Sequence, residues 1–272
     1  VDRIDISTVG PLAHTVADAA ALLAAMANQR PKPLPPPPGP LRVRFTTHGP
    51  LLPAPAQVRA QVERVARALA DMGHSIDEGP KIAGELEEFL PVWQRQVADV
   101  PAWREGVLQP ATRWLRETGR KHTRKEVRAA FEVLYARILD WFGDADLWLT
   151  PTVSVPPPAI GAWRELDGKE VFLRAAPLGQ FTAPFNIGGQ PAATLPIGLS
   201  DEGLPLGVQV VARAGADDLL LSVCRALEEA LAAKEEALRR AEMERAMKED
   251  AVDVTLPGRP LARGRLHPVT SG

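Results

Sequence analysis

The chain of 272 residues is long enough for one large domain or two of ordinary size, and its 45% hydrophobic and 24% charged residues are typical of a globular protein. Its formal net charge of -2 argues against a chain-wide electrostatic partner such as a nucleic acid or an anionic membrane. The single cysteine, Cys224, excludes an intrachain disulfide and a multi-cysteine zinc site. We expect Cys224 to be buried on a helix as a small apolar side chain.

The sequence contains no feature of a membrane-inserted or exported protein. No apolar run approaches the roughly 18 residues that are needed to cross a bilayer. The first residues lack the basic segment and following apolar stretch of a secretory signal. We therefore expect a cytoplasmic protein that does not bind membranes.

The first predicted element is a helix over residues 15–26, which are rich in alanine and leucine and contain no helix breaker. Thr15 is the expected N-cap, with Asp18 at the third helical position in a variant of the capping box. Residues 31–40 are mostly proline and predict a polyproline-type loop or linker.

An alternation of strands and helices follows. Residues 41–46 alternate apolar and polar side chains, which is typical of a strand. Residues 55–72 carry apolar side chains at helical spacing and end before Gly73, a typical residue beyond a helix C-terminus. Residues 74–78 then predict a short strand. This helix–strand–helix–strand order indicates the α/β class.

Residues 85–142 are predicted to be mostly helical. Four tryptophans are spread along this segment: Trp93, Trp103, Trp114 and Trp141. We expect them to pack helices onto the core, while some could line a pocket. Residues 146–150 then form a short apolar strand that leads into Pro151.

The last part of the chain predicts a hairpin and two helical segments. Residues 190–199 and 206–211 read as strands joined by a turn at residues 201–203. Residues 217–232 form a helix with periodic apolar positions. Residues 234–250 are almost all Ala, Glu, Lys, Arg, Leu and Met, which favours a long solvated or coiled-coil helix.

Three stretches together resemble the amidase-signature family. They are STVGPLAHTVADAAALLAAM at 7–26, DADLWLTPTVSVPPPAIG at 144–161 and FTAPFNIGGQPAATLPIGLSDEGLPLGVQVV at 181–211. The resemblance covers residues 1–232 and identifies them as the C-terminal part of an amidase domain. It implies a mixed central sheet flanked by helices, hydrolysis of carboxamide C–N bonds, and catalysis without a metal or a cofactor.

The resemblance also implies a triad of a nucleophilic serine, a bridging cis-serine and a lysine that acts as the base. The lysine must be neutral to accept a proton, so its pKa must be depressed in the site. No two serines are adjacent in this chain, no glycine-rich serine loop is present, and no lysine precedes Lys32. In the family the triad lies before the segment that matches residues 7–26. No residue of this chain is therefore predicted to be catalytic, and we expect it to be inactive alone.

One stretch of the matched region is expected to lie beside the active site. Its candidate residues for the wall or support of a substrate pocket are Phe181, Phe185, Asn186, Gly189 and Gln190. Gly188 and Gly189 would permit close backbone approach, and the Asn186 amide could hold a loop by hydrogen bonds. The structural alternative is a tight turn into a buried strand, with Asn186 and Gln209 satisfying backbone groups.

The matched region departs from the family pattern at one position. The family commonly has Gly–Pro–x–x–Arg where this chain has Gly10-Pro11-Leu12-Ala13-His14. His14 cannot supply a permanent bidentate cation. Elsewhere, His48, His74 and His122 stand alone and are expected to be structural or exposed.

The tail resembles a different family. Residues 253–259 (DVTLPGR) and 264–268 (GRLHP) are similar to the linker of phenylalanyl-tRNA synthetase alpha-subunits, with residues 233–251 as the end of the preceding helical arm. The alternative is a generic charged helix followed by a disordered end over residues 252–272. Acidic residues balance the basic ones in the helix, so binding of nucleic acid is not expected. The two resemblances together suggest a chimeric or mis-assembled reading frame.

Two functions from different classes are compatible with these observations. The first is a truncated amidase that acts on a small-molecule amide only if the missing half complements it. The second is a non-catalytic interaction module or fusion protein that docks through the charged helix. Self-association through an exposed sheet edge or through that helix is possible under both hypotheses.

Overall fold

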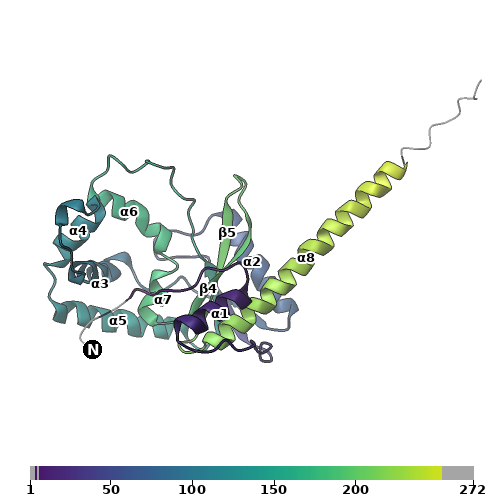
Figure 1. Cartoon of the computed structure of the whole chain (residues 1–272), viewed down its shortest axis with the longest axis horizontal. Coiled ribbons are helices and arrows are strands. Elements are labelled where there is room, and N and C mark those ends of the chain that lie inside the picture. Colours follow the sequence, from purple (N-terminus) through teal and green to yellow (C-terminus); the bar gives the residue numbers. More distant parts are fainter. Residues whose placement is uncertain (1–3, 5, 253–272) are drawn as a thin grey trace, which may run out of the picture. The chain divides into compact units, whose positions relative to one another are not determined.

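The computed structural model describes residue 4 and residues 6–252 (Figure 1). The chain divides into two compact units, residues 1–230 and 231–272, and each is described by itself. The synthetase-like stretches predicted at residues 253–259 and 264–268 lie outside the described residues.

A five-stranded sheet forms the centre of the first unit. Its strands are β1 (Arg42–Phe45), β2 (Ser75–Glu78), β3 (Leu147–Pro151), β4 (Ala192–Leu199) and β5 (Pro205–Ala212). They lie in the order β2-β1-β3-β5-β4. Strand β1 pairs in parallel with β2 and β3, whereas β5 pairs antiparallel with β3 and β4. The predicted mixed sheet flanked by helices is confirmed.

The helices match the predicted positions in part: those over residues 16–26 and 56–71 lie within one residue of the predicted ranges, those over residues 168–179 and 183–188 were not predicted, and residues 217–252 form one helix where two segments were predicted. They are α1 (Val16–Met26), α2 (Ala56–Asp71), α3 (Leu86–Asp99), α4 (Pro110–Gly119), α5 (Arg124–Phe142), α6 (Gly168–Gly179), α7 (Ala183–Gly188) and α8 (Asp217–Val252), with a 3-10 turn at Glu105–Val107. The predicted cap of α1 is present, because the Thr15 side chain accepts a hydrogen bond of 3.1 Å from the Asp18 backbone N–H. Met72 caps α2, and Gly73 follows with a φ of 92°, as its place after the helix requires.

Helix α2 supplies the crossover between the parallel strands β1 and β2, which a short turn cannot connect. It packs against β3 and β5. Its buried stripe includes Val58, Val62, Val65 and Leu69, at the spacing of one helix face.

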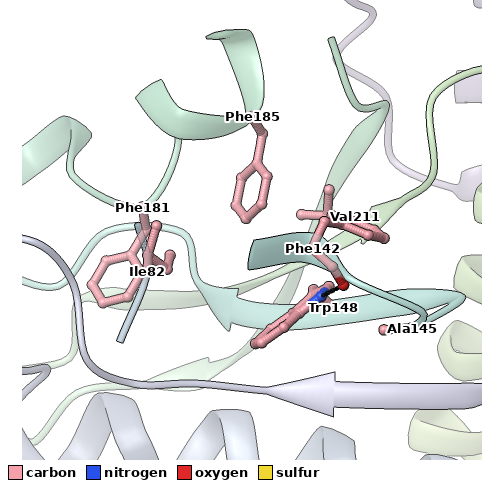
Figure 2. Close-up of a cluster of buried hydrophobic side chains, with 7 residues drawn as sticks. All are labelled: Ile82, Phe142, Ala145, Trp148, Phe181, Phe185 and Val211. Atoms are coloured by element: carbon pink, nitrogen blue, oxygen red, sulfur yellow. Dashed lines mark hydrogen bonds between the residues drawn. The ribbon is translucent and has the colours of Figure 1, made fainter. Parts of the chain in front are cut away.

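A second core cluster joins the sheet to α5 and α7. Its members are Ile82, Phe142, Ala145, Trp148, Phe181, Phe185 and Val211. Figure 2 shows the Phe185 ring pointing from α7 toward the sheet. Trp148 is fully buried, donates its indole N–H to the Phe142 carbonyl at 3.0 Å and stacks on Trp141 with ring centroids 3.9 Å apart. This cluster fixes the position of α7 on the sheet.

The tryptophan prediction holds for three of the four positions. Trp141 stacks on Trp148, Trp93 on Phe89, and Trp114 lies against the ring of Phe172. The prediction was wrong for Trp103, whose relative exposure is 101%. Trp103 lies in the connection between α3 and α4 rather than on a helix face, so no neighbouring element covers it.

The hairpin and the start of α8 complete the first unit. Strands β4 and β5 are joined at residues 200–204, where Gly203 adopts a φ of 79°. Helix α8 buries Leu220, Val223, Cys224 and Leu227, so the predicted burial of Cys224 is confirmed. Within the second unit, α8 continues to Val252 as a charged helix with an ion pair between Arg240 and Glu236 one turn apart.

No helix in the described part of the chain is both long and apolar enough to cross a membrane. Among the same residues, no group of three or more histidine, cysteine, aspartate or glutamate side chains is arranged to hold a metal ion.

Candidate functional site

A cavity of about 280 Å³ lies in the first unit, beside part of the stretch over residues 181–190. Helices α3, α5, α6 and α7 and the loop at Pro50 and Leu51 surround it. Aromatic and aliphatic side chains form most of its wall, among them Phe89, Trp93, Leu134, Ile138, Phe172 and Ile187. The polar lining residues are Glu85, Gln180, Thr182 and Asn186. A concave apolar site with a few polar groups is typical of small-molecule binding.

Helix α7 reaches the cavity because two glycines allow a sharp turn after it. Gly189 caps the helix in the left-handed conformation, with a φ of 67°, and its N–H bonds to the Phe185 carbonyl. Most residues avoid this conformation, which glycine adopts freely. A Cβ atom on Gly188 would overlap the amide end of the Gln190 side chain, so a larger residue there would require this side chain to move.

The five candidate residues fall into three different environments. Asn186 is exposed and lines the cavity. Phe181 and Phe185 are buried in the core cluster with Trp148 and do not line the cavity. Gly189 and Gln190 form the turn, and the buried Gln190 Oε1 has no hydrogen-bond partner among the described residues. Of the five candidate residues, Asn186 alone therefore lines the cavity, and the other four lie behind it.

Gln209 has the structural role that the sequence offered as an alternative, because it satisfies a backbone group. Its side-chain amide donates hydrogen bonds of 2.9 Å to the Phe181 carbonyl and to the Thr150 hydroxyl. Gln209 is buried in β5, so it ties the start of the candidate stretch to the sheet. Asn186 does not share this role, because its side chain lies at the cavity.

Sequence reasoning missed Gln180, which holds the wall together. This residue is 4% exposed. Its Oε1 accepts hydrogen bonds from the backbone N–H groups of Leu51, at 2.9 Å, and Leu52, at 3.0 Å. Its Nε2 donates to the Ser154 hydroxyl at 2.5 Å. Gln180 thus joins the end of α6 to two loops, and nothing in its local sequence indicates these distant partners.

The hydroxyl and thiol groups of the described core have structural roles. Ser154 accepts from Gln180 and donates to the Pro177 carbonyl at 3.4 Å. The Ser222 hydroxyl donates to the Asp218 carbonyl within α8. Burial raises the pKa of the Cys224 thiol to about 12, and Glu228 adds to the shift. A thiol that stays protonated is a poor nucleophile.

The histidines occupy structural or exposed positions, as expected. His74 Nδ1 accepts a hydrogen bond of 3.2 Å from the Leu41 backbone N–H, and burial lowers the pKa of His74. His122 shares a hydrogen bond of 3.0 Å with the Gln94 side chain. His48 and His14 are exposed.

Comparison with known proteins identifies relatives of most of the first unit. The family model described as amidase matches residues 3–221. The chain is 30% identical over 262 residues to 6-aminohexanoate-cyclic-dimer hydrolase from Pseudomonas sp. (strain NK87). This match covers 82% of this chain and 53% of that protein. The corresponding enzyme of Paenarthrobacter ureafaciens is also 30% identical over 262 residues, with the same coverage.

A solved structure agrees with this relationship. The structure of 6-aminohexanoate cyclic dimer hydrolase complexed with substrate superposes with a TM-score of 0.67 at 28% identity, covering 80% of this chain and 54% of that one. The chain thus spans about half the length of the relatives it matches. The match over most of the chain shows that it belongs to the amidase family.

Proposed function

We propose that this chain forms the substrate-pocket part of an enzyme that hydrolyses small carboxamides, and that the nucleophile and base come from a segment outside these 272 residues. The observation that supports this most strongly is the apolar cavity beside α7, which has a binding wall without a side chain of the nucleophile or base that the resemblance implies. Among the described residues that line it, there is no serine, cysteine, lysine or histidine. Alone, the chain is expected to be inactive.

The chemistry that the resemblance implies divides naturally between two segments. On the complementing segment, a neutral lysine would accept a proton through the bridging serine as the nucleophilic serine attacks the amide carbonyl. The C–N bond would then break as the amine leaves with a proton, and water would release the acid from the acyl-enzyme. This chain would bind the part of the substrate next to the amide and exclude water from it.

A complementation experiment tests this proposal. The chain would be produced alone and together with the N-terminal part of the Pseudomonas hydrolase that precedes its matched region. Alone, it should neither release ammonia from benzamide nor be labelled by a fluorophosphonate. The co-purified complex should release ammonia, with the label on the complementing segment. Labelling of this chain at any of its six serines, or a stable complex without turnover, would overturn the proposal.

The second candidate is an interaction module that docks through the charged part of α8. Its supporting observation is that residues 232–237, among them Glu235 and Glu236, are exposed on a continuous helix. The synthetase-like tail and the chimeric origin belong to the same proposal. Light scattering of the chain with and without residues 234–272 tests it. A loss of a defined oligomer on truncation supports docking, and an unchanged mass contradicts it.

A further inference from the structure

The wall of the cavity suits an apolar group. Phe89 and Trp93 lie one turn apart on α3 and stack with ring centroids 6.1 Å apart. Phe172 adds a third ring from α6, and the buried side chains of Leu134 and Ile138 line it from α5. Aromatic and aliphatic walls favour apolar groups because binding removes both surfaces from water.

The charge of the lining opposes anionic groups. Glu85 is the one ionisable side chain among the residues that line the cavity. Its carboxylate pairs with Lys81 at 3.1 Å and also caps α3. The described lining residues offer no cation to a carboxylate of a ligand, and the Glu85 carboxylate already occupies Lys81. A ligand that carries an acid group into this cavity would therefore lose its hydration without gaining a counter-ion.

The polar groups of the lining differ in their capacity to bind a ligand. The Gln180 amide is engaged at both ends, and the Thr182 hydroxyl donates to the Gly179 carbonyl at 3.2 Å. Asn186 is exposed, and its side chain makes no hydrogen bond recorded among the described residues. Its amide can both donate to a carbonyl oxygen and accept from an N–H, which are the two groups of a carboxamide.

The volume limits the size of the ligand. An engineered apolar protein cavity of roughly 150 Å³ holds benzene. The present cavity, of about 280 Å³, has room for one aromatic ring with a short substituent or for an alkyl chain of similar volume.

We propose that this cavity binds an uncharged aryl or alkyl group of the substrate and excludes groups that carry a carboxylate. Trp93 and Phe89 contact the bound group. Asn186 forms a hydrogen bond to the adjoining carboxamide. The meaning of the cavity as a substrate subsite rests on the proposed amide hydrolysis. Binding to the cavity is a property of this chain by itself and can be measured without turnover.

The first test compares two probes of the same ring size. Isothermal titration calorimetry would measure binding of benzamide and of 4-carbamoylbenzoate to the full chain. Benzamide should bind at least about tenfold more tightly, the equivalent of one unpaired polar or charged group. Equal affinity, tighter binding of the carboxylate, or no binding of benzamide would overturn the inference.

Variants with matched controls locate the binding. Ala176→Trp places a bulky side chain in the lining and should abolish benzamide binding, whereas Arg174→Trp on the exposed part of the same helix should not. Trp93→Leu should weaken binding about tenfold, and Trp103→Leu, at a fully exposed tryptophan, should leave it unchanged. Asn186→Ala, an exposed position, should weaken binding about fivefold without affecting folding.

These outcomes are separate from those of the proposed function. If the chain binds benzamide as described but the complemented enzyme does not hydrolyse amides, the cavity is a binding site and the proposed reaction fails. If the complemented enzyme hydrolyses amides while Ala176→Trp and Asn186→Ala leave benzamide binding unchanged, the reaction stands and the subsite inference fails.

Discussion

Replacement of Gln180 by leucine tests whether this residue supports the cavity. The leucine side chain has a similar length but removes the acceptor for two backbone N–H groups and the donor to Ser154. Each lost hydrogen bond costs about 1 kcal/mol, and a buried N–H left without a partner adds to this cost. Leu51 is half-buried, while Leu52 is exposed enough for water to replace the lost acceptor. We therefore expect Gln180→Leu to lower the free energy of unfolding by about 3 kcal/mol.

Gln190 provides a matched control ten residues away. It is also buried, but its Oε1 has no hydrogen-bond partner in the described part of the chain. Replacing an unsatisfied polar group by an apolar one of similar shape is nearly neutral. Gln190→Leu should therefore change the free energy of unfolding by less than about 1 kcal/mol.

Urea unfolding followed by tryptophan fluorescence distinguishes the two variants, because the Trp141–Trp148 stack reports on the core. With a slope of about 2 kcal/mol per molar urea, Gln180→Leu should lower the unfolding midpoint by about 1.5 M. If Gln180→Leu loses no more stability than Gln190→Leu, the three hydrogen bonds do not hold the loops, and the reasoning is wrong.

Three further predictions concern the core and the pH dependence of stability. Gly79→Ala should lower the free energy of unfolding in urea by about 1–3 kcal/mol, because the added Cβ would overlap the Trp148 ring. This loss of stability should be smaller when Trp148 is replaced by phenylalanine, and an equal loss in that background would contradict the reasoning. Native Cys224 should resist a thiol reagent at pH 8 and react once the chain unfolds, since its raised pKa keeps the thiol protonated; rapid labelling of the folded chain would contradict this. Hydrogen bonds from Arg95, with a weaker one from Arg124, hold the pKa of Asp99 below its ordinary value of 3.8. The stability that Asp99 contributes is therefore present above pH 3.8 and is lost as the pH falls toward its folded pKa. The temperature of thermal unfolding should consequently change less with pH in this range for Asp99→Asn than for the unsubstituted chain.

Local sequence signals predicted the strands and the first helices, but not the helices at residues 168–179 and 183–188, because such signals act over a few residues. The Thr15 cap, the apolar stripe of α2 and the glycine after it each act within one helix. The same signals could not predict that α4 and α6 would pack together, because that contact depends on the path of the whole chain. The error at Trp103 has the same origin, since a large aromatic residue is buried only where another element reaches it.

The candidate site was predictable in part. The family resemblance directed attention to residues 181–190, and the structure places Asn186 from this stretch at a cavity. The opposite wall comes from α3, where Phe89 and Trp93 carry no motif that distinguishes them from core residues. Most of the chemical character of the cavity therefore arises from segments that the resemblance did not single out.

Gln180 and Gln190 show why residue type and position in a matched stretch are insufficient to assign a role. Both glutamines are buried. Gln180 lies directly after α6, and Gln190 lies just beyond the end of α7. The partners of Gln180 lie 128 and 129 residues earlier in the chain, at Leu52 and Leu51, and 26 residues earlier, at Ser154. The Gln190 side chain lies against Gly188, and its Oε1 has no hydrogen-bond partner among the described residues. A buried glutamine stabilises the wall of the cavity when its amide forms hydrogen bonds with groups from distant parts of the chain. Those groups lie beside it only in the folded structure, so the local sequence does not reveal them.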